Sequence, residues 1–181
     1  CSAGGDAIMT ATMLLNSGEA DAVLAVGGES ILCPIVVSGL AQAKALSRRN
    51  DDPEHACRPF DADRDGFVIG EGGGALLIET EEHAVKRGAT IYARLAGWAN
   101  TSDAHHVTAP CPDGEGAARC MKLALARAGM QPSDIGYINA HGTSTPLGDK
   151  AETLAVKSVF GGRECAPPMS STKSATGHLM G

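Results

Sequence analysis

Aromatic side chains are scarce in this sequence: they make up 3% of the 181 residues, as one Trp, two Tyr and three Phe. Glycine, by contrast, occurs 23 times, and apolar residues account for 43% of the chain. This profile suits a sheet packed between helices, with Ala, Gly and Val at the tight contacts. So much apolar side chain to bury also argues against an intrinsically disordered protein.

An excess of positive charge and a long apolar run are both missing. The formal net charge is -6, which leaves no broad basic surface for phosphate backbones and argues against nucleic-acid binding. No apolar stretch approaches the roughly 18 residues that a membrane-spanning helix needs. We therefore expect a protein that associates with neither nucleic acid nor a membrane.

The cysteines lack the C-x-x-C spacing of common metal and redox sites. They stand at Cys1, Cys33, Cys57, Cys111, Cys120 and Cys165. We expect no disulfide framework and no secretory leader, but free thiols in a reducing cytoplasm. Because the chain starts without Met and stops abruptly after Gly177–Gly181, we also expect a piece of a longer protein.

Strand-like and helix-like segments alternate along the chain. Short apolar runs predict strands at 22–26, 74–79, 91–99, 134–140 and 169–172, of which the first two have the continuous apolar pattern of strands buried on both faces. Helical patterns occupy 7–15, 36–46, 81–87, 114–128 and 151–160, and most of them end at a glycine. This alternation predicts a layered α/β architecture.

Two loops imitate known binding motifs. Asp61–Gly66 resembles the start of a calcium loop, but the twelfth position, where that loop requires Glu, is Gly72. Gly70–Gly74 is glycine-rich, yet it lacks the Lys-Ser/Thr of a phosphate loop and leads into a strand instead of a helix. We interpret both as structural.

Three other segments carry reactive groups at places where strands or loops meet helices. Cys1–Gly4 stands at a helix start, while His141–Pro146 and Lys173–His178 each follow a predicted strand. Ligands bind at such strand ends in open α/β sheets. A histidine taken singly is more often structural than catalytic, but a cysteine and two histidines in such turns indicate an active site. A zinc site formed by the same three residues remains open, although the motifs lack local pairs of ligands.

Four blocks, in order, carry a resemblance to a known family: CSAG at 1–4, RPFDADRDGFVIGEGGG at 58–74, NAHGTSTPLGD at 139–149 and SSTKSATGHLMG at 170–181. Over essentially its whole length the chain resembles the β-ketoacyl-acyl-carrier-protein synthases of the thiolase superfamily. The stretches at 44–61 and 103–110 are most similar to the bacterial type II elongating enzyme.

The resemblance implies a partial thiolase-like fold, layered α-β-α-β-α, with two similar halves and buried mixed sheets. Residues 1–85 would form the later part of the N-terminal half, and residues 86–181 the first part of the C-terminal half. The full-length protein would be a cytoplasmic homodimer.

The resemblance also implies a role for each site residue. Cys1 would be the nucleophile, His141 and His178 the two active-site histidines, and Lys173 the lysine that supports them. A Cys–His–His set implies a decarboxylating condensation of malonyl-acyl-carrier-protein with a Cys-bound acyl chain, which elongates fatty acids by two carbons without a metal or cofactor. The substrate-binding candidates are Thr143, Thr145, Thr108 and Leu40.

Lys44, with Arg48 and Arg49, forms a basic cluster that we expect to help dock acyl carrier protein. A solvated helix end explains the cluster equally well. Leu40 likewise has ordinary core packing as its competing interpretation.

The chemistry expected at Cys1 follows from general principles. A thiolate is the attacking species, and a helix N-terminus favours it by about 0.3–1 kcal/mol. The backbone N–H of Cys1 would supply half of an oxyanion hole, and the two imidazoles would donate to the enolate formed on decarboxylation.

Three other functions compete with the elongating synthase. An N-terminal-nucleophile hydrolase would use the α-amine of Cys1 as its base, and N-terminal sequencing of the full-length gene product distinguishes it. A ketosynthase domain of a polyketide synthase would share the motifs. A non-catalytic partner of the chain-length-factor kind would lack the nucleophile. We expect the isolated 181 residues to be inactive and to expose core and sheet edges.

Overall fold

The computed structural model describes residues 1–181 as a mixed α/β protein. Its elements, in chain order, are α1 (Ala3–Asn16), β1 (Ala22–Glu29), α2 (Pro34–Gln42), η1 (Pro53–His55), β2 (Gly72–Glu79), α3 (Glu81–Lys86), α4 (Glu115–Ala128), η2 (Pro132–Asp134), β3 (Ile138–Asn139), α5 (Pro146–Phe160), β4 (Met169–Ser170) and α6 (Lys173–Thr176). None of the helices has the length and apolar character needed to cross a membrane.

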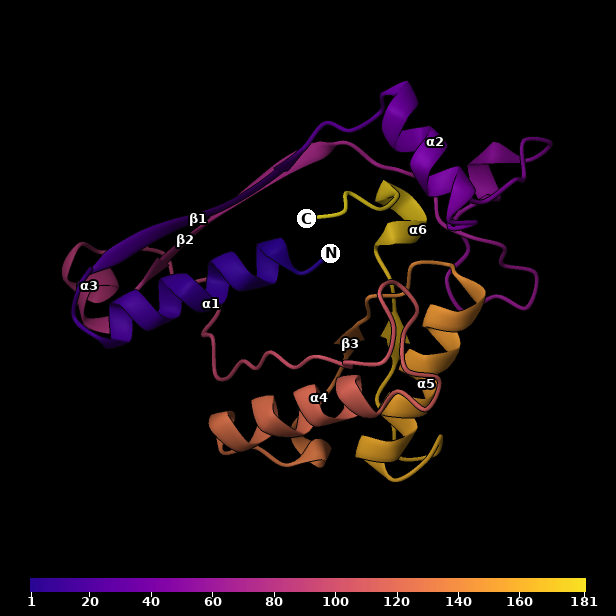
Figure 1. Cartoon of the computed structure of the whole chain (residues 1–181). Helices are drawn as coiled ribbons and strands as arrows, with labels where there is room; N and C mark the ends of the chain where they lie inside the picture. The colour runs from indigo at the N-terminus through magenta and orange to yellow at the C-terminus, as the bar shows by residue number, and fades with distance from the viewer.

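A long two-stranded ribbon forms one side of the molecule (Figure 1). Strands β1 and β2 pair antiparallel from Ala22↔Glu79 to Glu29↔Gly72, and α1 packs along them. Alternate residues of a strand face opposite sides, so the side that holds the buried Ala25 is the one that α1 covers. The ribbon thus places the start of α1 beside the glycine-rich ends of both strands.

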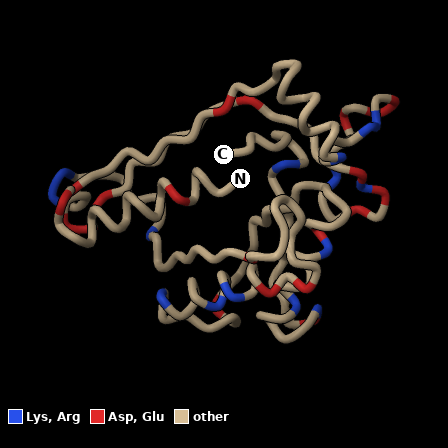
Figure 2. The backbone as a smooth tube through the Cα atoms, viewed as in Figure 1, with Lys and Arg blue, Asp and Glu red and all other residues tan.

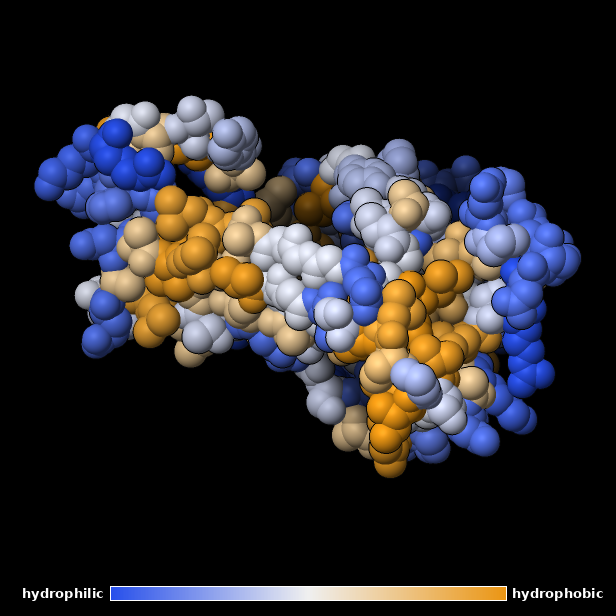
Figure 3. Space-filling view, turned by 90° about the horizontal axis from the view of Figure 1, so that it is seen from above, coloured by the Kyte–Doolittle hydropathy of each residue, from blue (hydrophilic) through white to orange (hydrophobic).

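The opposite side of the ribbon is bare, which makes the expectation of strands buried on both faces wrong. Leu24 and Leu77, which pair across the ribbon, are 62% and 54% exposed. The physical reason is that two strands and one helix leave nothing to cover the second face. Apolar side chains gather there when the molecule is viewed from above (Figure 3).

The expected strand at 91–99 is also absent, because residues 91–100 run without regular secondary structure. Its apolar pattern is correct for a strand, but a strand needs a partner for its backbone groups. The only sheets in the structure are β1–β2 and β3–β4, and neither of them extends to this segment.

The compact core lies where α4 and α5 pack together, below the ribbon in Figure 1. Its buried members are small or aliphatic with one ring: Ala118, Ala155, Val156, Val159 and Phe160. Ile138 and Met169, from the parallel pair β3–β4, pack against this cluster. The core is therefore built from close contacts between alanine-lined helices instead of from many aromatic side chains.

The expected helix ends at Gly129 and Gly161 hold, and α3 begins at Glu81 as expected, whereas α1, α2 and α5 begin earlier than expected. Gly129 and Gly161 take the left-handed φ of 66° and 80° that closes α4 and α5. α5 begins at Pro146 rather than 151, because the Thr145 side chain caps it by accepting from Gly148 N. α2 begins two residues before the expected 36–46 span and ends sooner, since Lys44 has a φ of 55°.

The acidic loop at 61–66, which imitates a calcium motif, is hydrogen-bonded to the neighbouring segment of chain. Asp65 accepts hydrogen bonds from Ser47 Oγ (2.6 Å) and Arg48 N (2.9 Å). Gly66 has a φ of 148°, and a Cβ there would lie 2.5 Å from the Leu46 carbonyl carbon. The loop thus closes against the 45–47 segment, as the structural interpretation predicted.

Charged residues stand mainly at the far end of the ribbon, on the outer helices and in the loops (Figure 2). The two ends of the chain meet in the middle of the molecule, where Gly181 lies 3.7 Å from a Cβ placed on Gly4. The N-terminal cysteine therefore comes close to the turns at the C-terminal end.

Candidate active site

Three backbone features bring the three reactive segments together. The parallel pairing Ile138↔Met169 and Asn139↔Ser170 leaves the His141 and Lys173 turns side by side at the same ends of β3 and β4. A parallel bridge between Ile69 and His178 joins the end of the Lys173 turn to the segment before β2. Cys1 then approaches from the start of α1, two residues ahead of the helix.

The side chains of Cys1, His141 and His178 converge at this point. His178 Nε2 lies 3.2 Å from Cys1 Sγ. The two imidazole rings meet edge to face, with centroids 5.5 Å apart and an interplanar angle of 87°. One ligand-type atom from each residue lies within 4.8 Å of the others, so a thiol faces two imidazoles across a single reacting space.

The backbone determines which nitrogen of His178 carries the proton. Met180 N–H donates to His178 Nδ1 at 3.2 Å, so Nδ1 must hold a lone pair. In the neutral ring the proton is then on Nε2, the atom that faces Cys1 Sγ. Burial, His141 and Lys173 together lower the pKa of His178 to about 4, which keeps the ring neutral at ordinary pH. His178 is therefore held as a hydrogen-bond donor toward the thiol.

The His141 turn is fixed through its backbone. Glu152 accepts His141 N at 2.7 Å and Gly142 N at 2.8 Å, one on each carboxylate oxygen. Lys173 Nζ donates to His141 O at 2.7 Å. Desolvation by the surrounding protein, followed by the Lys173 charge, lowers the pKa of His141, so both imidazoles favour the neutral form.

Lys173 lies behind the two histidines and does not contact the thiol. Burial lowers its pKa, while Glu152 opposes that shift. Ser171 connects the same two turns, since its Oγ donates to Gly142 O (2.8 Å) and accepts from Lys173 N (3.3 Å). Lys173 thus ties the His178 turn to the His141 turn and adds positive charge near both rings.

A buried centre behind Thr143 and Thr145 escaped the sequence analysis. Ser144 is fully buried with a φ of 70°, and all its polar groups are paired: N with Asp149 Oδ1, O with Gly66 N, and Oγ with Arg58 N. Asp149 is 1% exposed, and burial raises its pKa despite the nearby Arg64. The one signal in the sequence was the block of polar residues between His141 and Asp149. In the structure the buried Asp149 carboxylate accepts a hydrogen bond from Ser144 N within this block.

The substrate-binding candidates divide into two groups. Thr143 and Thr145 lie in the His141 turn with their hydroxyls 3.0 Å apart. Thr108 is in an exposed loop, where its N–H donates to His106 Nδ1. Leu40, half-buried on α2, is not among the residues that line the cavity beside Cys1. The structure places the first two in the same turn as His141, although neither lines that cavity, and places the other two in separate segments.

The basic cluster proposed for docking is only partly free. Lys44 and Arg48 are exposed and form no ion pair, while Arg49 donates through Nη2 to Asp63 O at 3.1 Å. Its Nε is buried without a partner. The cluster therefore presents two unpaired cations beside the end of α2.

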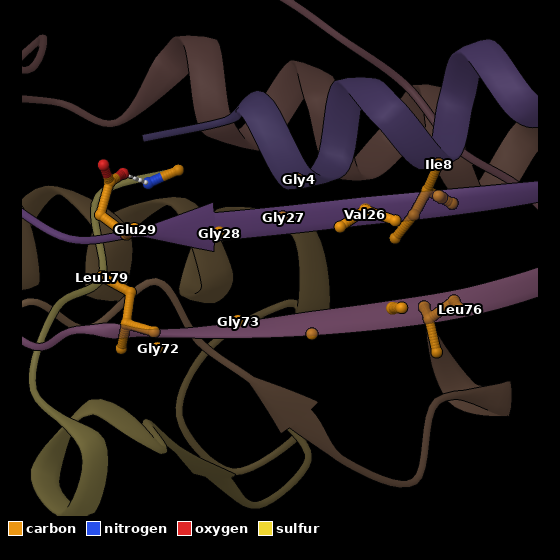
Figure 4. A pocket seen from close by; sticks show the side chains of 14 residues that line it. Gly4, Ile8, Val26, Gly27, Gly28, Glu29, Gly72, Gly73, Leu76 and Leu179 are labelled. Carbon is orange, nitrogen blue, oxygen red and sulfur yellow. Dashed lines mark hydrogen bonds between the residues drawn. The ribbon is translucent and has the colours of Figure 1, made fainter.

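An open cavity of about 780 Å³ adjoins the reacting space, with Cys1, His141 and Glu152 on one wall and Trp98 and Met121 on another. A second cavity, of about 350 Å³, lies between α1 and the ribbon (Figure 4). There Ile8, Val26, Leu76 and Leu179 surround bare glycine backbone, and Glu29 accepts a hydrogen bond from Gly181 N. This second cavity has no nucleophilic side chain paired with a base, so we place the chemistry in the first cavity.

Cys1, His141 and His178 are also the one cluster with the side chains and spacing to hold a metal ion. Zinc would need the Nε2 lone pair of His178, whereas the Met180 N–H contact places the proton on that nitrogen. Switching the tautomer would set Nδ1–H against Met180 N–H. The geometry therefore suits a hydrogen-bond donor better than a zinc ligand.

Comparison with known proteins agrees with this geometry. Residues 1–84 match the family model described as the N-terminal domain of β-ketoacyl synthase, and residues 92–181 match the model of its C-terminal domain. The chain belongs to the β-ketoacyl synthase family, and its fold is the thiolase-like fold of the ketosynthases.

Particular relatives narrow the resemblance. The chain is 52% identical over all its length to 3-oxoacyl-[acyl-carrier-protein] synthase 2 of Synechocystis, 44% of which it covers, and 54% identical to the enzyme of that name from Rhizobium meliloti, 43% of which it covers. It thus spans less than half the length of these curated relatives.

Solved structures give the same result. A type II polyketide ketosynthase, solved with its acyl-carrier protein, matches 99% of this chain with a TM-score of 0.95 and 44% identity; the match covers 44% of that chain. A β-ketoacyl synthase from Burkholderia phymatum matches 99% of this chain with a TM-score of 0.91 and 43% identity, over 42% of its own length.

Proposed function

We propose that this chain carries the reacting centre of an elongating β-ketoacyl-acyl-carrier-protein synthase, which joins a Cys-bound acyl chain to malonyl-acyl-carrier-protein with loss of CO2. The observation that carries the proposal is the placement of Cys1 Sγ 3.2 Å from a His178 nitrogen that bears a proton, with the His141 ring beside it.

The first half-reaction is transfer of the acyl group to Cys1. Donation from His178 Nε2–H stabilises negative charge on Sγ, and the thiolate attacks the acyl thioester carbonyl. The bond between that carbonyl and the carrier sulfur breaks, and the carrier thiol leaves with the proton that the Cys1 thiol gave up. The acyl chain now occupies Cys1 as a thioester, which divides the condensation into two easier steps.

The second half-reaction breaks a carbon–carbon bond. As the malonyl group loses CO2, its electron pair forms an enolate whose charge rests on the thioester oxygen. Two neutral imidazoles, with ring nitrogens within 4.8 Å of each other and of Cys1 Sγ, would suit that oxygen, and the lowered pKa values of His141 and His178 favour the neutral state. The carbanion then attacks the Cys1 thioester, its C–S bond breaks, and the thiolate returns.

Lys173, Thr143 and Thr145 have supporting roles in this proposal. Lys173 Nζ holds the His141 carbonyl, and its charge adds to burial in keeping both rings in the neutral form. Thr143 and Thr145, whose hydroxyls lie 3.0 Å apart in the His141 turn, would bind the thioester arm. For Thr108 and Leu40 as further substrate contacts, the support remains the sequence resemblance.

The wider assignments rest on the same resemblance. Acyl carrier protein is the proposed partner, and Lys44 with Arg48 is the proposed part of its docking face. Charge reversal at Lys44 should raise the apparent KM for carrier-protein substrates but not for small thioesters; equal effects on both would remove the docking role. Residues 1–85 are proposed as the later part of the N-terminal thiolase-like half and residues 86–181 as the first part of the C-terminal half. The full-length protein is proposed to be a cytoplasmic homodimer.

The test of the reaction uses the full-length gene product with acyl- and malonyl-carrier protein. We expect a β-ketoacyl product two carbons longer than the acyl donor. Cys1→Ala should abolish that product while malonyl decarboxylation continues, because the two histidines remain. Condensation by the Cys1→Ala protein would refute the proposal.

Elongation of a polyketide chain is the second candidate, favoured by the 44% identity to a type II polyketide ketosynthase. The 49–54% identity to the curated 3-oxoacyl-[acyl-carrier-protein] synthases 2 places fatty acid elongation first. A saturated acyl donor accepted in preference to a poly-β-keto donor of equal length would support that order, and the reverse preference would overturn it.

A further inference from the structure

Both histidine turns are hydrogen-bonded to the same stretch of chain, the bridging segment 58–70. At its start, Arg58 N donates to Ser144 Oγ at 3.0 Å, and further along Gly66 N donates to Ser144 O at 2.9 Å. At its end, Val68 O accepts from His178 N (2.7 Å), and Gly70 N donates to His178 O (2.9 Å). The segment therefore connects the two turns by a route separate from the β3–β4 pair.

The ring of Phe67 adds a direct contact between the bridging segment and His178. The two rings meet edge to face with centroids 5.0 Å apart and an interplanar angle of 75°. Phe67 is also paired through its backbone with Ala45 and Ser47. A shift of the segment along its length would consequently move one wall of the His178 pocket relative to the His141 turn.

Arg64 is the side chain that joins this segment to the His141 turn. Its Nε donates to Thr145 O at 3.2 Å, its Nη2 to Pro146 O at 2.7 Å, and its Nη1 to Asp61 O at 2.8 Å. The side chain is 18% exposed. All three donating nitrogens of the guanidinium are thus engaged, two with the end of the His141 turn and one with the bridging segment itself.

Asp149 completes the connection. Its carboxylate accepts Ser144 N at 3.2 Å and Phe60 N at 2.7 Å, one residue from each side of the junction. Arg64 Nε lies 3.4 Å from Asp149 Oδ2 and is the one cation in an ion pair with this buried carboxylate. A planar guanidinium reaches two carbonyls and a carboxylate at once, which a lysine ammonium on its flexible stem cannot do.

We propose that Arg64 is a positioning residue: it fixes the bridging segment against the His141 turn and so sets the separation of the two imidazoles. The proposal rests on the proposed function, in which both imidazoles must donate to one enolate oxygen. Arg64 contacts neither the thiol nor the imidazoles, so its effect passes through Thr145, Pro146 and the bridging segment.

The test compares two rates in the full-length gene product: decarboxylation of a malonyl thioester, which needs both histidines, and alkylation of Cys1 by iodoacetamide, which needs the thiolate and its His178 partner but not His141. Since misplacing a reacting group by an ångström costs about a hundredfold, Arg64→Gln should slow decarboxylation by about ten- to a hundredfold. Alkylation of Cys1 should stay close to the wild-type rate. Arg64→Lys keeps the charge and should regain part of the loss.

Arg119→Gln is the matched control. Arg119 also donates to a carboxylate (Glu115) and to a carbonyl (Ser102 O), but it contacts neither histidine turn. Both rates of this variant should match the wild type. An Arg64→Gln variant that loses both rates equally, or keeps full decarboxylation, would overturn the proposal.

Histidine ring spectra by ¹H–¹⁵N NMR separate this proposal from the proposed function. The ring signals of His141 should move relative to those of His178 in Arg64→Gln and should stay in place in Arg119→Gln. A wild-type protein that never decarboxylates malonyl thioesters would refute the proposed function. Unmoved His141 signals in Arg64→Gln would refute the positioning role by itself.

Discussion

At the residue scale, His178 is a buried histidine with one ring nitrogen already occupied by a hydrogen bond. It is 3% exposed, and its Nδ1 is occupied by the Met180 N–H. Protonation would therefore both bury a charge and break that hydrogen bond. Burial, followed by the charges of His141 and Lys173 nearby, explains why the folded protein holds the pKa near 4 while the unfolded chain has the ordinary value of 6.5.

This difference in pKa predicts a pH dependence of stability. Between pH 6.5 and about 4 the unfolded chain binds a proton at His178 that the folded protein does not, so stability is full above this window and falls as the pH drops through it. At about 1.4 kcal/mol per pKa unit the loss amounts to up to about 3 kcal/mol. Urea unfolding of wild type and His178→Gln at pH 7 and pH 4.5 measures it.

His178→Gln should show a smaller loss on acidification than the wild type. His105→Gln, in the exposed loop, is the control and should keep the wild-type loss. Identical pH dependence in wild type and His178→Gln would show that His178 titrates normally in the folded protein.

Glu152 should matter through the two backbone N–H groups that it holds. Its two oxygens accept the N–H groups of His141 and Gly142, and a glutamine offers one acceptor oxygen and one amide group that faces a donor. Since hydrogen bonds to a charged group contribute about 1.5–3 kcal/mol, Glu152→Gln should cost about 2 kcal/mol of stability and slow malonyl decarboxylation. Glu164→Gln, exposed and unpaired, should change neither quantity in denaturant and rate measurements.

The sequence identified the reacting side chains but missed what holds them. Cys1, His141, His178 and Lys173 stand in recognisable turns, so their convergence was predictable. Glu152, Asp149 and Arg64 act on backbone atoms of those turns across up to 82 positions of sequence separation. The sequence pattern gives no sign of such contacts, because a buried and hydrogen-bonded acidic or basic residue cannot be distinguished in the sequence from a solvent-exposed one.

At the element scale, the start of α5 ties helix stability to the site. Thr145 caps the helix by accepting from Gly148 N, and its hydroxyl also meets that of Thr143. Thr145→Ala should therefore cost about 1 kcal/mol of stability, while Thr145→Ser should preserve most of it. Thermal unfolding measures both.

Thr80→Ala is the matched control, because Thr80 caps α3 in the same way by accepting from His83 N. It should lose a similar free energy of unfolding and leave the KM for malonyl thioester unchanged, whereas Thr145→Ala should raise that KM. Equal KM values in the two variants would contradict a substrate-binding role for Thr145.

Helix ends were easier to predict than helix starts. A glycine that closes a helix is visible in the sequence at Gly129 and Gly161, but the cap at Thr145 stands within a run of small polar residues with no clear boundary. The segment 91–99 shows a different limit. Its apolar pattern describes what the residues can bury, while the presence of a pairing strand depends on the rest of the fold.

At the scale of the whole molecule, the ribbon of β1 and β2 has one covered and one bare face. Leu24 and Leu77 expose more than half of their surface on the bare face, and both strands have a free edge. Such surfaces promote association between copies. The 181-residue chain by itself should therefore self-associate in a concentration-dependent way, measurable by sedimentation velocity.

A lysine on the bare face should weaken this association. Leu24→Lys should shift the sedimentation distribution toward the monomer. Val85→Lys, at a site on α3 that is equally exposed (63% against 62%), should leave the distribution unchanged. Equal effects of both lysines would point to net charge instead of the ribbon face.

The position of Cys1 beside a proton-bearing His178 nitrogen underlies the whole proposed reaction. Its most direct test is peptide mass spectrometry of the full-length gene product after incubation with acyl-carrier protein, before any malonyl donor is added. We predict one acyl adduct, on Cys1, which disappears in Cys1→Ala. An adduct on another of the six cysteines, or one that persists in Cys1→Ala, would contradict it.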